Sequence, residues 1–252
     1  VAVGERRPSL AAPTRSMVLG LVGACLGVRR DDLVGQASLA QDFGVATRTD
    51  AEGVLLVDYH TAQAPDGPRI SAFRRRTGRL PATRREELRC TVDAKGNPAA
   101  LETQLSQRQY RCDSAFAIAL WLRREPAAWS LERVAEALAS PTFIPFAGRR
   151  SAALALPFQP LLLDAEDPVA ALRVARFSLD DLILGLLKPK WQGGGTKRTF
   201  RWEGDWKGLV PDRTETRRDQ VVSRSRWQFI QRDEHVLVER VEAEATDVVE
   251  PA

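Results

Sequence analysis

The sequence has few of the features that membrane insertion and disulfide scaffolds require. No apolar stretch reaches the roughly 20 residues that a membrane-spanning helix needs, because arginine or glycine interrupts every candidate. Three cysteines, Cys25, Cys90 and Cys112, lie far apart and without CxxC spacing, which excludes a disulfide scaffold and a cysteine zinc cluster. These absences predict a cytoplasmic protein, and the 252 residues suffice for one large domain or two small ones, with ample apolar sequence for a core.

Residues suited to catalysis are also scarce. Metal-free RNA cleavage needs a base, usually histidine, and only His60 and His235 are present. They lie too far apart in the sequence for the histidine pair of an HNH nuclease. Gly193 to Lys197 lacks the spacing of a phosphate-binding P-loop, and no Rossmann fingerprint occurs. The sequence therefore predicts no metal and no cofactor, and it favours binding over catalysis.

Arginine is abundant and unevenly placed. Of the 37 basic residues 32 are arginine, whose planar guanidinium binds phosphate through two parallel hydrogen bonds and stacks on bases. High genomic GC content would give the same bias. The net charge of +4 conceals +6 over residues 62–112, +7 over 188–232 and −6 over 233–252. Composition bias does not explain this clustering, which indicates contact with a polyanion.

Seven arginines fall within residues 74–89. A segment with this charge density either stays solvated or lies against a polyanion. The members of the cluster are Arg74, Arg75, Arg76, Arg79, Arg84, Arg85 and Arg89.

Hydrophobic periodicity predicts a mixed α+β chain. Residues 62–107 have no steady period and carry several prolines and glycines, so we expect a long projecting insertion there. The last residues, 241–252, form an acidic tail without a period. The first expected helix has apolar residues from Val18 to Leu26, with Thr14 or Ser16 as its cap and Gly27 as its end. Further helices are expected at 31–39, 130–139, 168–174 and 178–187. The expected strands cover 43–49 and 54–61, joined as a hairpin through 50–53, then a central strand at 114–122, and 227–231 and 236–240.

Three segments are candidate anion-binding sites. The first, Thr14, Arg15 and Ser16, combines the amides of a helix start with two hydroxyls and a guanidinium, although simple capping explains it equally well. The second places Gly148 beside twin arginines and an aromatic ring. The third ends the insertion, where Tyr110 is suited to stack a base and Arg108 to hold a phosphate. The second and third sets are Phe146, Gly148, Arg149 and Arg150, and Arg108, Gln109 and Tyr110.

In their order along the chain, several motifs resemble a known family. They are Pro-Thr-Arg-Ser at 13–16, Gly-Leu-Val-Gly-Ala-Cys-Leu-Gly at 20–27, Asp-Tyr-His-Thr at 58–61, Gln-Tyr-Arg-Cys-Asp-Ser at 109–114 and Gly-Arg-Arg-Ser at 148–151. The ordered set is similar to CasD, the fifth Cas protein family, in the subtype I-E CRISPR surveillance complex Cascade.

The resemblance implies a fold and a role. The fold would be a ferredoxin-like, or RRM-like, α+β palm over residues 1–252 with a β-hairpin thumb inserted at 62–108. The role would be a non-catalytic cap that binds the 5′ handle of the CRISPR RNA (crRNA). Implied partners are the backbone subunit (CasC), the large subunit (CasA) and, through the assembled complex, target DNA.

The resemblance also implies roles for residues, with alternatives. Arg15, Ser16, Arg149 and Arg150 would hold handle phosphates, Arg108 and Tyr110 would orient a displaced base, and the arginines of 74–89 would contact the backbone subunit or guide strand. In the related subtype I-C the corresponding protein is the processing endoribonuclease, so metal-independent cleavage is the alternative function. A general nucleic-acid binder without handle preference is a third.

Overall fold

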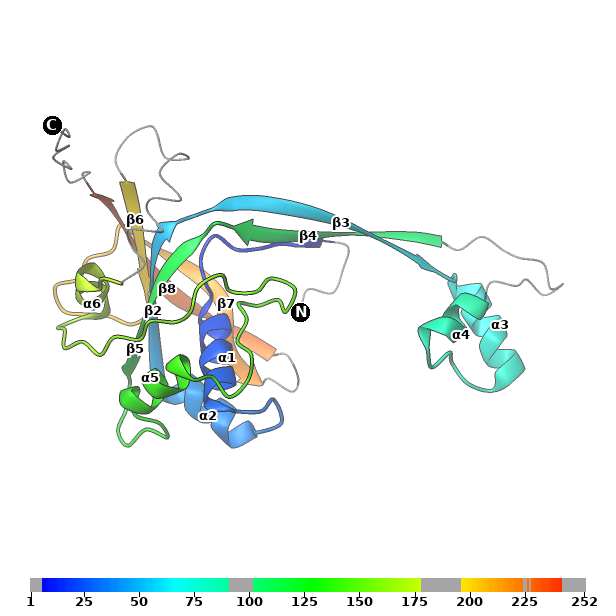
Figure 1. Cartoon of the computed structure of the whole chain (residues 1–252), viewed down its shortest axis with the longest axis horizontal. Helices are drawn as coiled ribbons and strands as arrows, with labels where there is room; N and C mark the ends of the chain where they lie inside the picture. The colour runs from blue at the N-terminus through cyan, green and yellow to red at the C-terminus, as the bar shows by residue number, and fades with distance from the viewer. Residues whose placement is uncertain (1–5, 91–101, 178–195, 224–225, 227, 242–252) are drawn as a thin grey trace, which may run out of the picture. The chain divides into compact units, whose positions relative to one another are not determined.

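Segments of helical and strand period alternate along the chain, and the computed structural model has the mixed α+β fold that this pattern predicted (Figure 1). It describes residues 6–90, 102–177, 196–223, 226 and 228–241. The chain divides into two units: Val1–Ser9 with Leu55–Tyr110, called unit 1, and Leu10–Val54 with Arg111–Ala252, called unit 2. Within the described ranges, no helix has the length and apolarity needed to cross a membrane.

Unit 2 is built on four described helices whose first turns are capped by side chains. Thr14, Asp32, Ser130 and Asp167 each accept a hydrogen bond from a backbone N–H of the first turn, which satisfies donors that the helix itself leaves open. The helices are α1 (Arg15–Leu26), α2 (Leu33–Asp42), α5 (Leu131–Ala139) and α6 (Pro168–Val174).

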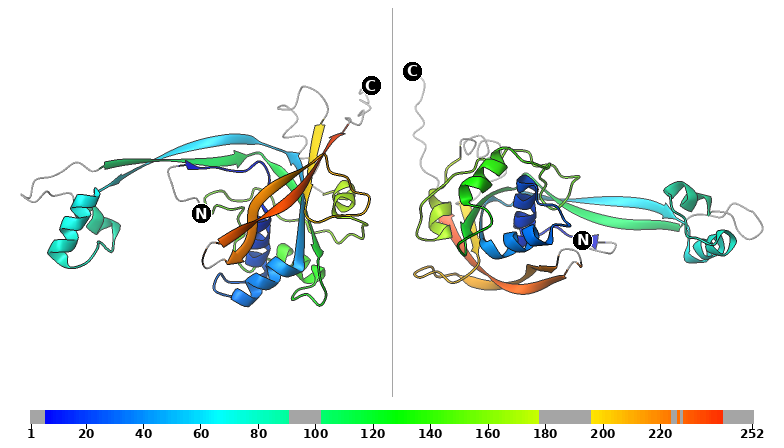
Figure 2. Two further views of the ribbon diagram at one scale, coloured as in Figure 1. Left: turned by 180° about the vertical axis from the view of Figure 1, so that it is seen from behind. Right: turned by 90° about the horizontal axis from the view of Figure 1, so that it is seen from below.

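An antiparallel five-stranded sheet in the order β5-β2-β6-β8-β7 forms the framework of unit 2. Figure 2 shows this sheet curving around α1. Its strands are β2 (Phe43–Ala51), β5 (Ala115–Leu122), β6 (Thr196–Trp202), β7 (Arg213–Ser223) and β8 (Gln228–Val241).

Apolar side chains cover both faces of this sheet. On one face Phe43 and Val45 of β2 pack with residues of α1, α2 and α5. On the other face Ala46 of β2 packs with Trp202 of β6 and with α6. Successive residues of a strand point to opposite faces, so β2 contributes to both cores and is almost wholly buried.

Unit 1 contains a three-stranded sheet in the order β1-β4-β3, with two helices between β3 and β4. Asp66 caps the first helix and Thr83 the second. The elements are β1 (Arg6–Arg7), β3 (Val54–Ala64), α3 (Gly67–Thr77), α4 (Arg84–Arg89) and β4 (Glu102–Cys112).

Several expectations were wrong. The strands at 43–51 and 54–64 do not form a hairpin, because the first belongs to the five-stranded sheet and the second to the three-stranded sheet. Residues 67–77 and 84–89 are helical, although their charge hid the helical period. The strand at 115–122 lies at the end of the sheet order, not at its centre.

Along the rest of the chain, β6 was missed because Lys197, Arg198 and Arg201 interrupt its apolar residues, and β7 was missed because arginines and acidic residues dominate it. The two short strands expected within 227–240 are one strand, β8. The helix expected at 178–187 and the acidic tail after Val241 lie outside the described residues.

We expect Gly44→Ala to destabilise the protein. A Cβ at Gly44 would lie 2.1 Å from the Trp121 ring, which packs edge-to-face on Trp206 with centroids 5.5 Å apart. Forcing this ring out of place costs about 1–3 kcal/mol, measurable by urea unfolding. Gly67→Ala is the control, since nothing lies within 4 Å of its added Cβ. Equal stability of the two variants would contradict the packing described for Trp121.

Candidate nucleic-acid interface

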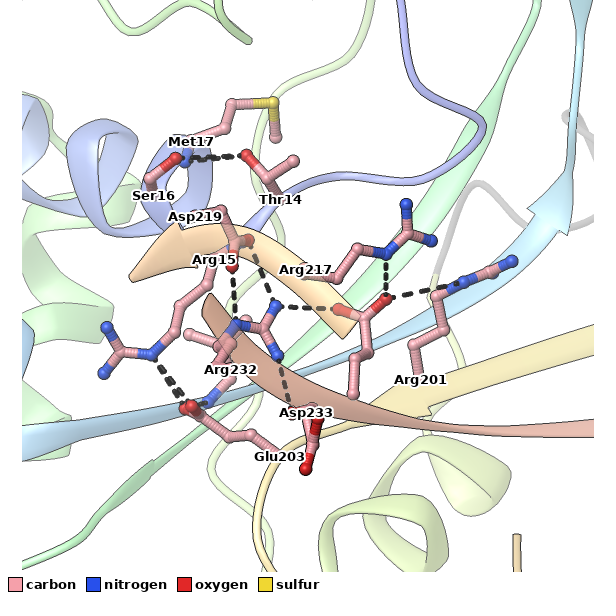
Figure 3. Close-up of polar contacts among 12 residues, drawn as sticks. Thr14, Arg15, Ser16, Met17, Arg201, Glu203, Arg217, Asp219, Arg232 and Asp233 are labelled. Carbon is pink, nitrogen blue, oxygen red and sulfur yellow. Dashed lines mark hydrogen bonds and ion pairs between the residues drawn. The ribbon is translucent and has the colours of Figure 1, made fainter. Parts of the chain in front are cut away.

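The first candidate segment lies at the start of α1. Thr14 is the N-cap, and its hydroxyl accepts a hydrogen bond from the Met17 N–H at 3.3 Å (Figure 3). The hydroxyls of Thr14 and Ser16 lie 3.3 Å apart. The capping explanation of Thr14 therefore holds, since the hydroxyl satisfies a donor of the first turn.

Arg15 points into the protein. Its side chain is 1% exposed, and its Nε donates to both carboxylate oxygens of Glu203 at 2.9 and 3.0 Å. Its Nη2 donates to the carbonyl oxygens of Ala40 and Phe43, each at 2.8 Å. Glu203 also accepts from the Val45 N–H at 2.8 Å, so one buried ion pair joins α1, the end of α2, β2 and the segment after β6.

A carboxylate of the chain itself also occupies the positive end of α1. The Arg15 backbone N–H donates to Asp219 Oδ2 at 2.7 Å, where the amide donors and the helix dipole favour an anion. Asp219 pairs with Arg232 at 2.6 Å. Burial lowers the pKa of Arg232, but its hydrogen bonds to Asp219 and Glu234 outweigh this effect and raise the pKa overall.

This arrangement differs from the expectation that Arg15 holds a phosphate. A buried guanidinium already bonded to a carboxylate and two carbonyls would have to leave those partners to meet a ligand, and leaving one charge of a buried pair uncompensated costs about 3–5 kcal/mol. Arg15 is accordingly a positioning residue for α1.

The second candidate segment is an irregular loop after α5. Its start is fixed to the C-terminal end of α1, because the N–H groups of Thr142 and Phe143 donate to carbonyls of that helix. Gly148 has φ +80° and open space around its missing Cβ, which is the conformation and the room that close backbone approach requires. Arg149 is half-buried, and Arg150 is exposed with no ion pair to any described residue.

The third candidate segment is the C-terminal part of β4, in unit 1. Gln109 is held in place by Ser9, whose N–H donates to Gln109 Oε1 at 3.2 Å. Arg108 lies opposite Arg7 of β1, and its buried Nε has no hydrogen-bond partner among the described residues. Tyr110 is half-buried. Thus the first two segments belong to unit 2 and the third to unit 1.

The arginine cluster is divided between paired and unpaired side chains. Arg79 forms two hydrogen bonds with Glu86, at 2.6 and 2.8 Å, and Arg84 pairs with Glu87 at 2.8 Å. The bonds from Arg79, followed by the Ala82 N–H, lower the pKa of Glu86 to about 2. Arg76 and Arg79 lie over the ring of buried Phe73. These contacts tie α4 to the end of α3.

Three other arginines of these helices have exposed side chains: Arg74, Arg75 and Arg85. None of these three side chains has an ion pair or hydrogen bond within the described residues. We call these three residues the free tip arginines. Their charges are uncompensated, as a phosphate-binding surface requires.

Candidates for catalysis are few. His60 Nε2 lies 2.5 Å from Asp58 Oδ2, with both side chains 41% exposed. His235 Nδ1 lies 2.9 Å from the Thr214 hydroxyl, and its ring packs on Trp202, a structural role. In the part of the chain that the structure describes, no three histidine, cysteine or acidic side chains are grouped to hold a metal.

Sequence reasoning missed the acidic anchors of α1. Glu203 and Asp219 lie 188 and 204 residues from Arg15, so no local pattern connects them. The sequence held a partial signal for Asp219. Arg213, Glu215, Arg217 and Asp219 alternate in charge at every second position, which is the spacing of side chains on one face of a strand.

The fold is that of CRISPR-associated proteins. A solved structure entitled "CRISPR RNA-guided surveillance complex" contains a chain similar over 96% of this chain and 85% of its own length, with a TM-score of 0.55 and 24% identity. Another, "Crystal structure of Cas protein", is similar over 93% of this chain and 83% of its own, with a TM-score of 0.50 and 22% identity.

The chain belongs to the family described as CRISPR-associated protein (Cas_Cas5), whose profile matches residues 1–233. It is 34% identical over 166 residues to "CRISPR system Cascade subunit CasD" of Escherichia coli (strain K12). That alignment covers 66% of this chain and 66% of the relative. The family resemblance seen in the sequence motifs is thereby confirmed.

We expect Glu203→Gln to lower the free energy of unfolding by about 3–5 kcal/mol, because it leaves Arg15 as a buried charge without a carboxylate. The control is Glu239→Gln, which breaks the half-exposed pair with Arg173 and should cost at most about 1 kcal/mol. Chemical unfolding at neutral pH measures both. A loss for Glu203→Gln no larger than that of the control would refute the anchoring role of this pair.

Proposed function

We propose that this protein is a non-catalytic subunit of a subtype I-E Cascade complex that binds the 5′ handle of crRNA. In this proposal unit 2 is the RRM-like palm and unit 1 the thumb. The subunit caps the guide RNA beside the backbone subunit (CasC) and the large subunit (CasA), and supports recognition of target DNA by the assembled complex. The family match over residues 1–233 carries the proposal.

The exposed arginines support an RNA partner. Most described arginines of unit 2 are engaged by carboxylates, whereas Arg150 and the free tip arginines are not. Unpaired guanidinium groups gain most from phosphate, because contact releases condensed counterions and no internal ion pair is broken. Handle bases would be read on unstacked nucleotides, since A-form duplexes hide their edges in a deep groove.

The apolar surface of unit 1 supports protein partners. Leu55, Leu56 and Val57 of β3 follow one another in the chain and are 45%, 53% and 37% exposed. A strand with apolar side chains exposed on both faces is typical of an interaction surface. Because this run carries no cation, we assign it to a neighbouring subunit and not to RNA.

The loop after α5 offers the first test. Arg149→Ala combined with Arg150→Ala should impair assembly with guide RNA and partner subunits and flatten the salt dependence of RNA binding by about two units, one for each phosphate contact. Arg150→Ala alone should leave the thermal unfolding temperature unchanged, because Arg150 is exposed, so it separates lost RNA contacts from any packing loss at half-buried Arg149. Co-purification and titration at several salt concentrations measure these effects; unchanged assembly with an unchanged slope would reject these contacts.

The division of the arginine cluster gives a second test. Replacing the free tip arginines Arg74, Arg75 and Arg85 with Gln should weaken RNA binding while α3 and α4 stay folded. The matched variant Arg79→Gln with Arg84→Gln breaks the pairs with Glu86 and Glu87 and should reduce helicity more than binding. Binding titrations and circular dichroism separate the two. If the free tip variant binds like wild type, these residues do not contact RNA.

One observation favours the alternative, a metal-independent endoribonuclease. Asp58 Oδ2 lies 2.5 Å from His60 Nε2, as a carboxylate beside an imidazole base would, although this contact lacks hydrogen-bond geometry, and neighbouring Tyr59 is 66% exposed. Incubating the protein with labelled repeat RNA and a chelator distinguishes the non-catalytic cap from the nuclease. Bound, uncut RNA supports the cap; cleavage lost in His60→Ala or Tyr59→Phe establishes the nuclease. Equal affinity for scrambled RNA would indicate a general nucleic-acid binder.

A further inference from the structure

Arg201 of β6 is an unusual arginine in this structure. Its side chain is only 11% exposed, and its nearest carboxylate, Glu234, is 3.8 Å from Nε, beyond hydrogen-bond distance. That buried Nε has no hydrogen-bond partner among the described residues. The neighbouring arginines differ, since Arg217 and Arg232 both form hydrogen bonds of 2.6–3.0 Å with carboxylates.

Two threonines next to Arg201 share this lack of partners. Thr47 of β2 is directly opposite Arg201 in the antiparallel pairing of β2 and β6, so their side chains point to the same face. Thr49 lies two residues further along that face. Both threonines are buried, at 3% and 4% exposure, and neither hydroxyl has a partner in the described part of the chain. Buried polar groups in native proteins are nearly always hydrogen-bonded, so three adjacent exceptions require an explanation.

The local charge balance indicates the sign of the missing partner. On this face four arginines meet three carboxylates through the ion pairs of β6, β7 and β8, which leaves one positive charge uncompensated. Burial lowers the pKa of Arg201, and the nearby carboxylates of Glu234 and Glu215 only partly oppose that effect. Figure 3 shows the outer nitrogens of Arg201 pointing away from Arg15 and Arg232.

We propose that Arg201, Thr47 and Thr49 form a binding site for one phosphate group on the α1 face of the five-stranded sheet. A phosphodiester carries one negative charge, which balances the excess on this face, and its two free oxygens accept from the guanidinium and from the hydroxyls. The ligand enters past Arg201, the most exposed of the three residues. The assignment of the phosphate to the guide-RNA backbone rests on the proposed function; free phosphate has the same chemistry.

The test uses the full chain and two probes, inorganic phosphate and a labelled repeat RNA. The double variant Thr47→Val, Thr49→Val keeps the side-chain shape and removes two unsatisfied hydroxyls, so its unfolding temperature without ligand should be unchanged or raised. Its affinity for RNA should fall about tenfold, because hydrogen bonds to a charged group are lost. Arg201→Gln should also reduce the salt dependence of binding by about one unit.

Arg133→Gln is the charge-matched control. It removes the same charge from α5, outside the four arginines of this face, and Arg133 is half-exposed and already paired with Glu136. Phosphate, compared with chloride at equal ionic strength, should raise the unfolding temperature of wild type and of the control but not of the two site variants.

The outcomes distinguish a guide-RNA phosphate from free phosphate, and failure of the site proposal from failure of the proposed function. If phosphate stabilises only the proteins with an intact site, but RNA affinity is the same in all of them, the site takes free phosphate and the guide-RNA assignment is rejected. If neither probe distinguishes the site variants from the control, the site proposal is overturned. If wild type binds no RNA but phosphate still stabilises it, the proposed function fails and the site stands.

Discussion

The buried ion pair between Arg15 and Glu203 is the contact on which the arrangement of unit 2 depends. It fixes the first residue of α1 to the sheet and to the carbonyls that end α2. Asp219 completes the anchor from β7 by accepting from the first amide of the helix. Because these groups are buried, each depends on the others for compensation of its charge, and α1 has one position on the sheet.

The arginines fall into two groups, according to whether a carboxylate of the chain pairs with them. Arg15, Arg217 and Arg232 are paired with carboxylates and stabilise the fold. Within the described residues, Arg150 and the free tip arginines have no carboxylate partner, so their charges are uncompensated. Arginine content alone therefore overstates the uncompensated positive charge, and the local pairing of each guanidinium is the better guide. Arg201 of β6 belongs to neither group, since its side chain is only 11% exposed and its Nε has no hydrogen-bond partner among the described residues.

The division of the chain into two units follows from strand pairing. A turn of two residues, Glu52 and Gly53, separates β2 from β3, yet the two strands belong to different sheets. Gly53 has φ +68°, and its missing Cβ would meet the carbonyl oxygen of Cys112 at 2.2 Å. Only glycine tolerates both the backbone angle and this close approach, so the chain can leave one sheet here and enter the other.

The sequence by itself determined the α+β class, the extents of α1, α5 and α6 and the family, because periodicity, caps and ordered motifs are local properties. It could not determine which strands pair, since that depends on contacts between distant residues. Nor did it predict α3, α4, β6 and β7, because their many charged residues obscure the hydrophobic periodicity. The tertiary structure alone decided the roles of the arginines. Whether a guanidinium faces a carboxylate, a carbonyl or solvent is set by residues as distant as Glu203 is from Arg15. These contacts bury Arg15 in the fold and leave Arg150 exposed.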